Sequence, residues 1–120
     1  MILTNYTCYD DQEIKNEQEK ADQFLQSKQL CKKVNIFKLL GDLNRIKIIE
    51  LLANYDKLCV YEISRLINAS VATTSHHLIA LKNNHLIGSK KEGKHVLYFL
   101  EDPKVIQVLR LAAQLGTYKN

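Results

Sequence analysis

The sequence predicts a mainly α-helical domain with one small β-hairpin. Apolar residues recur at helical spacing through most of the chain, and this spacing changes to a strand-like pattern only between Ile87 and Leu100. The single proline and four glycines exclude a low-complexity chain or a long flexible linker. The 120 residues are enough for one domain with one core.

Residues 1–33 are expected to form an N-terminal arm and a helix that packs in a dimer. Residues 1–9 show no clear period and suggest an extended arm. Asp10, with Glu13 three residues later, is typical of a helix start, and this helix is expected to reach about Gln26. Its narrow apolar stripe indicates a helix that packs on another surface, such as a partner chain.

Residues 34–120 are expected to form the second part of the chain, and its core begins with two helices. The mostly apolar run 34–40 predicts a short buried helix. Gly41 and Asp42 interrupt it, and Asp42 can cap the next helix. That helix, over residues 43–54, is broadly apolar and is expected to be central to the core.

Two amphipathic helices are expected next, over Cys59–Ile67 and Val71–Asn83, with a three-residue break at 68–70 between them. In the second of these helices, Val71, Leu78 and Leu81 are expected to face inward. Its other face is expected to carry Thr73, Thr74, Ser75, His76, His77 and Lys82, with His77 expected to pack or to form a local hydrogen bond.

A hairpin and a last helix complete the predicted fold. Glu92 and Gly93 form the expected tight turn between two strands. Asp102 as N-cap and Pro103 at the first position predict a helix from about Lys104 to Leu115. This helix is so apolar that a second copy of the chain is the simplest cover for its outer face.

The order of helix, three-residue turn, helix and hairpin is that of a winged helix-turn-helix. Residues 34–120 are therefore expected to form a winged helix-turn-helix domain that dimerises through its last helix. Short polar side chains on the second helix can reach base edges in a major groove, and lysines on a narrow hairpin suit phosphate. The residues predicted to read bases are Ser70, Thr73, Thr74, Ser75 and His76. The residues predicted to grip the DNA backbone are Lys90, Lys91 and Lys94. Taken singly, each lysine equally fits a solvated surface residue.

Charge and composition support a partner that is a polyanion. Residues 34–120 hold twelve basic and seven acidic side chains, whereas residues 1–33 are about neutral. The sequence has no apolar run long enough for a membrane span and no secretory signal, so we expect a cytoplasmic protein without a membrane partner. No catalytic signature is present, so no enzymatic activity is expected.

Three stretches together resemble the ArsR/SmtB family of metal-responsive repressors: Leu58–Ile63, Ala72–Leu78 and Lys91–Tyr98. The arm motif at residues 8–10, Cys-Tyr-Asp, is most similar to the CadC-like branch, which senses cadmium and lead. The resemblance runs from about residue 34 to 109. It implies a homodimer that holds operator DNA until a soft metal ion, such as Cd²⁺, Pb²⁺ or Zn²⁺, releases it.

The metal ligands that this resemblance implies are Cys8 and Cys59. Thr4 and Tyr61 stand where the branch has its other two thiolates, so two of four remain. The groups that could complete the site are Asp10, Asp11, Tyr61, Cys31 and water.

The family has a second, zinc-binding site on the last helix, and we expect it to be lost here. Lys104 occupies a histidine position of that site, and no histidine follows it up to Tyr118. Asp102 is therefore better interpreted as a helix cap.

Two alternatives remain open. In the first, the same DNA-binding fold senses thiol oxidation or persulfidation through Cys8 and Cys59. In the second, the fold is a protein-interaction module that binds no DNA. The odd number of cysteines argues against a structural disulfide framework, and the absence of a CxxC motif argues against a zinc ribbon or a thioredoxin-type motif.

Overall fold

The computed structural model describes residues 5–116. Residues 1–4 of the predicted arm, including Thr4, lie outside this range, as do residues 117–120. The chain divides into two compact units, with the boundary between Phe37 and Lys38. Each unit is described by itself.

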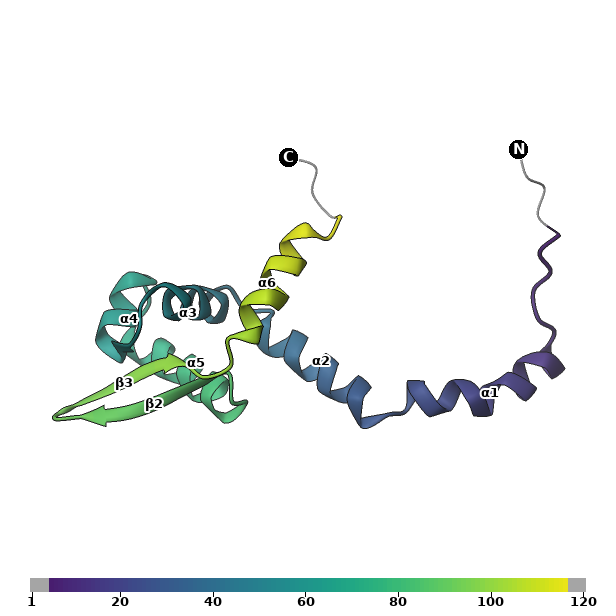
Figure 1. The fold of residues 1–120 in the computed structure, drawn as a ribbon, viewed down its shortest axis with the longest axis horizontal. Coiled ribbons are helices and arrows are strands. Elements are labelled where there is room, and N and C mark those ends of the chain that lie inside the picture. The colour runs from purple at the N-terminus through teal and green to yellow at the C-terminus, as the bar shows by residue number, and fades with distance from the viewer. Residues whose placement is uncertain (1–4, 117–120) are drawn as a thin grey trace. The chain divides into compact units, whose positions relative to one another are not determined.

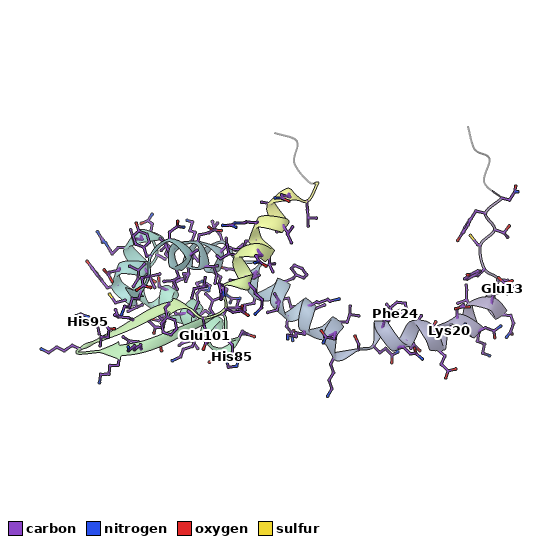
Figure 2. The ribbon with its side chains drawn as sticks, in the orientation of Figure 1. Glu13, Lys20, Phe24, His85, His95 and Glu101 are labelled. Carbon is purple, nitrogen blue, oxygen red and sulfur yellow. The ribbon has the colours of Figure 1, made fainter. Side chains whose placement is uncertain are left out.

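The first unit contains α1 (Asp11–Leu25) and most of α2 (Lys28–Leu40). The predicted cap of α1 is confirmed, because the Asp10 carboxylate accepts a hydrogen bond from the Glu13 amide at 2.8 Å. No residue of α1 is buried, and the Phe24 side chain labelled in Figure 2 is 65% exposed.

Helix α2 differs from the short buried helix expected over residues 34–40. It begins at Lys28, where the Ser27 hydroxyl accepts a hydrogen bond from the Leu30 amide at 3.3 Å. Only Leu39 and Leu40 are buried, while Phe37 is 63% exposed. Val34 and Phe37 therefore leave an uncovered apolar surface, and only the end of this segment enters the core.

The second unit is the winged part of the chain (Figure 1). Its elements, in order, are α3 (Leu43–Asn54), β1 (Leu58–Cys59), α4 (Val60–Leu66), α5 (Val71–Asn83), β2 (Ile87–Glu92), β3 (His95–Leu100) and α6 (Lys104–Gln114). The core lies where α5 packs on α3, α4 and β2. Its fully buried aliphatic side chains are Ile48, Ile49, Ile63, Leu78, Leu81 and Ile87. Within residues 5–116, no helix combines the length and apolar character needed to cross a bilayer.

The sheet has three antiparallel strands in the order β1-β3-β2, rather than the two that were expected. The added strand pairs Leu58 with Tyr98 and Cys59 with Leu97. Cys59, which was expected inside a helix, therefore ends a strand and stands at the N-cap of α4. At the far end of the hairpin, Gly93 adopts a φ of +61°, which favours glycine in the tight turn.

Helix α6 begins at Lys104, as expected. Its N-cap is Pro103, however, and not the predicted Asp102. Asp102 still accepts a hydrogen bond from the Lys104 amide at 3.1 Å. Of the helix residues only Val105 is buried, and Leu111 is 63% exposed. The outer face of α6 is therefore apolar and uncovered in a single chain.

Gly88→Ala is expected to lower the free energy of unfolding by about 1–3 kcal/mol, as overpacking does in other proteins. A Cβ atom at Gly88 would lie 2.6 Å from Cζ of Phe99, its partner across the β2–β3 pair. The Phe99 ring would have to move. Chemical denaturation measures the effect, and Gly116→Ala is the control because no atom lies within 4 Å of a Cβ there. Equal stability of the two variants would contradict this prediction.

Candidate nucleic-acid interface

Helix α5 presents part of the predicted base-reading set on its outer surface. Ser70, Thr73 and His76 are exposed, and Ser75 is half-buried. These positions follow from the opposite, buried face, which carries Thr74, His77, Leu78 and Leu81 at helical spacing. The exposed side chains offer hydroxyl and imidazole groups of the kind that contact base edges.

The expected outward placement of Thr74 is wrong. Its side chain is completely buried, and its hydroxyl donates a hydrogen bond to the Ser70 carbonyl at 2.8 Å. Thr74 lies four residues before Leu78 and so shares its inward face. The expected inward placement of Val71 is also wrong, because this residue is 47% exposed in the first turn of the helix.

Val71 is therefore an exposed residue of this surface that sequence reasoning missed. Its neighbour Ala72 is exposed too, so the first turn of α5 presents two small apolar side chains beside Thr73. Apolar side chains of this size can contact the methyl group of thymine in a major groove. Val71 lies seven residues before Leu78, so the helical period places it on the inner face and could not reveal its exposure, whereas Ala72 falls on a different face.

Ser70 is the N-cap of α5, because its hydroxyl accepts a hydrogen bond from the Thr73 amide at 3.0 Å. We expect Ser70→Ala to lower the free energy of unfolding by about 1 kcal/mol, the usual cost of a lost cap. Ser70→Asp should keep the cap and the stability, yet weaken DNA binding by placing a carboxylate beside phosphate. Denaturation and a DNA titration separate the two effects. A Ser70→Asp variant as unstable as Ser70→Ala would exclude the capping role.

The three predicted lysines lie on the hairpin formed by β2 and β3. Lys90, Lys91 and Lys94 are all exposed, and none of them forms an ion pair with another of the described residues. Figure 2 shows His95 close to the hairpin tip. This arrangement leaves three ammonium groups available to an anionic partner.

Two further lysines hold the hairpin in place, and the sequence pattern did not reveal them. Lys57 contacts Glu92 near the tip, with Nζ 2.6 Å from Oε1. This hydrogen bond raises the pKa of Lys57 and lowers the pKa of Glu92. Lys82 of α5 donates to the Ser89 hydroxyl at 2.6 Å. Helix α5 and the hairpin are thus joined directly by side chains.

The cysteines occur in different surroundings. Cys8 and Cys31 are exposed in the first unit, and Cys59 is half-buried in the second. The Glu62 carboxylate accepts a hydrogen bond from the Cys59 amide at 2.9 Å, and this bond lowers the pKa of Glu62. Among residues 5–116, no group of three or more His, Cys, Asp or Glu side chains is gathered closely enough to hold a metal ion. The second unit therefore offers a soft metal ion one thiolate and no complete site.

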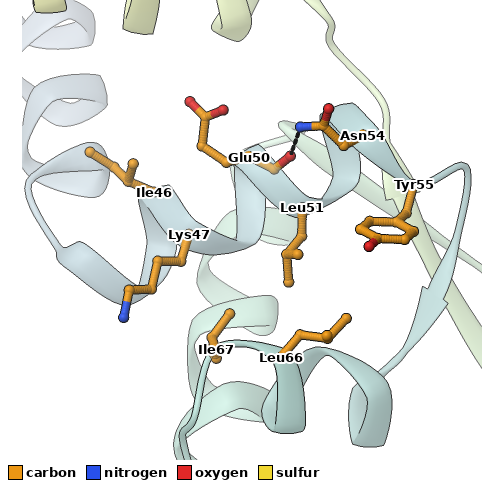
Figure 3. A pocket seen from close by; sticks show the side chains of 8 residues that line it. All are labelled: Ile46, Lys47, Glu50, Leu51, Asn54, Tyr55, Leu66 and Ile67. Carbon is orange, nitrogen blue, oxygen red and sulfur yellow. Dashed lines mark hydrogen bonds between the residues drawn. The ribbon is translucent and has the colours of Figure 1, made fainter.

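A hollow of about 750 Å³ lies between α3 and α4, on the surface of the second unit (Figure 3). Leu51 and Leu66 line it from opposite helices, and Tyr55 stands at one end. The Asn54 side chain at its rim donates to the Glu50 carbonyl at 2.8 Å. The lining includes none of the residues predicted to bind DNA or metal.

The fold, together with the exposed side of α5 and the hairpin lysines, defines a winged helix-turn-helix protein, as the sequence predicted. Residues 42–89 match the profile described as bacterial regulatory protein, arsR family. A cadmium resistance transcriptional regulatory protein, CadC, from Listeria innocua is 48% identical over 75 residues, which cover 62% of this chain and 63% of that protein. Residues 42–89 of the chain therefore form an ArsR-family helix-turn-helix domain.

Two further comparisons support this assignment. An uncharacterized HTH-type transcriptional regulator from Methanocaldococcus jannaschii is 34% identical over 84 residues, covering 70% of this chain and 94% of that protein. The solved structure of reduced HlyU from Vibrio cholerae aligns with a TM-score of 0.64 at 27% identity, covering 76% of this chain and 95% of that one. The matched part of the chain spans less than two thirds of the length of the cadmium-resistance relatives.

Proposed function

We propose that the protein binds double-stranded operator DNA as a homodimer and represses transcription. In this arrangement α5 enters the major groove, where Thr73, Ser75 and His76 contact base edges. The hairpin lysines contact phosphate on either side and fix the position of the helix. The observation that carries the proposal is the exposure of Thr73 and His76 on α5 and of the three lysines on the hairpin. A hydrogen bond from Lys82 to Ser89 joins this helix to the hairpin.

A homodimer is supported by the apolar surfaces that a single chain leaves uncovered. Leu111 of α6 is 63% exposed, its C-cap residue Leu115 is 69% exposed, and Phe24 of α1 is 65% exposed. Large apolar patches of this kind mark protein interfaces in soluble proteins. Under this proposal, residues 1–33 act as the arm and dimer-packing segment, and residues 34–120 act as the DNA-binding domain.

A gel-shift experiment tests the proposal. The wild-type protein is titrated against a duplex that it selects from a random pool and against a random duplex, over a series of salt concentrations. We expect tighter binding to the selected duplex, and an affinity for both that falls as salt rises. Binding that is absent at low salt would support the alternative of a protein-interaction module.

We further propose that a soft cation, Cd²⁺, Pb²⁺ or Zn²⁺, acts as inducer through Cys8 and Cys59. Thiolate chemistry suits these ions, and the similarity to cadmium-resistance regulators supports the choice. Cys59 stands at the start of α4, so a ligand on its thiol would act directly on the first helix of the DNA-binding motif. The rival signal is oxidation or persulfidation of the same thiols.

The inducer is tested by adding each ion, or a mild oxidant, to the preformed DNA complex. Release of DNA by one ion, accompanied by thiolate absorption, is expected for the wild type and not for Cys59→Ser. Cys8→Ser should lose the response as well, and a loss in Cys31→Ser would identify this thiol of α2 as a completing ligand. Release by oxidant alone would favour the redox alternative.

A further inference from the structure

Three polar side chains connect the start of α3 with the buried face of α5. Asp42 caps α3 by accepting a hydrogen bond from the Arg45 amide at 3.1 Å, and this bond lowers the pKa of Asp42. The Arg45 side chain continues toward α5, where its Nε atom donates to Nδ1 of His77 at 3.0 Å. Its Nη1 atom donates to the Leu39 carbonyl at 3.2 Å. Arg45 thus joins the end of α2, the start of α3 and the middle of α5.

His77 is nearly buried, with 8% of its surface exposed. Since its Nδ1 atom accepts the hydrogen bond from Arg45, the ring proton belongs on Nε2. That nitrogen lies 3.7 Å from the Asp42 carboxylate. The imidazole is therefore hydrogen-bonded to Arg45 on Nδ1, while Nε2 faces the Asp42 carboxylate at a distance too long for a hydrogen bond.

The ring of His77 also supports a side chain on the outer surface. The rings of His76 and His77 meet edge to face, with their centres 5.6 Å apart. His76 is exposed and belongs to the predicted base-reading set. The orientation of the buried His77 ring is thus linked to the orientation of the exposed His76 ring.

We propose that Arg45 and His77 form a positioning pair that fixes the rotation of α5 about its own axis and so determines how well Thr73 and His76 align with base edges. This inference rests on the proposed DNA binding. Apolar contacts of α5, such as those of Leu78, carry no directional preference and tolerate a small rotation. A hydrogen bond between two side chains on different helices is directional and does not tolerate such a rotation.

A small rotation of α5 is enough to disturb base contacts. Side chains reach about 5–6 Å from a helix axis, so a rotation of about 10° displaces their ends by about 1 Å. Hydrogen bonds to bases span only about 2.7–3.2 Å between heavy atoms. A displacement of this size would therefore remove base contacts while leaving the hairpin lysines on phosphate.

The pair is tested with His77→Leu, which removes the acceptor, and His77→Gln, which keeps an oxygen able to accept from Arg45. The probes are a duplex selected by the wild type from a random pool and a random duplex, at matched salt. For His77→Leu we expect the ratio of the two affinities to fall by about 10-fold, equivalent to the discrimination of one good base contact. His77→Gln should stay within about 3-fold of the wild type.

Thermal unfolding shows which variants are folded, and Arg45→Lys supplies a second test if His77→Leu does not fold. Arg45→Lys keeps the charge but loses the planar fork, so its affinity ratio should fall as well. An unchanged ratio in folded variants, an equal loss on both duplexes, or a His77→Gln variant as poor as His77→Leu would each overturn the proposal. A wild type that binds no DNA overturns the proposed function itself, and this outcome is recognised before any variant is compared.

Discussion

Leu78→Ala is expected to lower the free energy of unfolding by about 2–5 kcal/mol, which is the range for truncating a fully buried leucine. Leu78 has no exposed surface and lies on the inner face of α5, where this helix packs on α3 and α4. The loss combines the removed apolar contacts with the cavity that remains. Small domains have about 5–15 kcal/mol of stability in total, so the variant should be largely destabilised. Urea denaturation followed by circular dichroism measures the change.

Ile79→Ala is the matched control for this experiment. Ile79 is the next residue of the same helix, but it is 60% exposed. We expect its truncation to change stability by no more than about 0.5 kcal/mol. Similar losses for the two variants would contradict the orientation of α5 on which the candidate interface depends.

Replacing Lys90, Lys91 and Lys94 together with alanine is expected to abolish most DNA binding at physiological salt. Each lysine that contacts a phosphate contributes about 0.9 to the slope of log affinity against log salt, so the slope should fall by about 3 per protomer. The loss should be the same on selected and random duplexes, because phosphate contacts carry no sequence information. Titrations at several salt concentrations give both the affinity and the slope.

The control for this variant changes the same amount of charge elsewhere. Lys15, Lys20 and Lys47 are exposed lysines on α1 and α3, and their joint replacement should leave most of the slope intact. If both triple variants lose the same slope, the binding follows net charge and the hairpin has no special role.

Capping residues explain why some elements could be predicted closely from the sequence. Asp42 and Ser70 each accept a hydrogen bond from an amide three residues later, and the helices that follow them begin where expected. The hairpin was also predicted well, since Gly93 provides the positive φ of its turn. These signals are local and depend on no tertiary contact.

Other features depend on contacts between distant residues and could not be predicted in this way. Strand β1 has only two residues, and it exists because Leu58 pairs with Tyr98 much later in the chain. Thr74 was placed on the outer face because it is polar, although its spacing from Leu78 puts it inside. The Arg45–His77 contact joins residues that are 32 positions apart, and neither residue signals the other in the sequence.

The register of the short strand β1 places Leu97 between a thiol and a hairpin lysine. Cys59 stands opposite Leu97, and Leu97 stands opposite Lys90 on its other side, so the three residues form one row across the sheet. Adjacent strands are about 4.8 Å apart, and hydrogen bonds join each pair. The amide resonance of Leu97 should therefore record chemistry at the thiol on one side and phosphate contact on the other. A single isotope label can follow both events without altering a cysteine or a lysine.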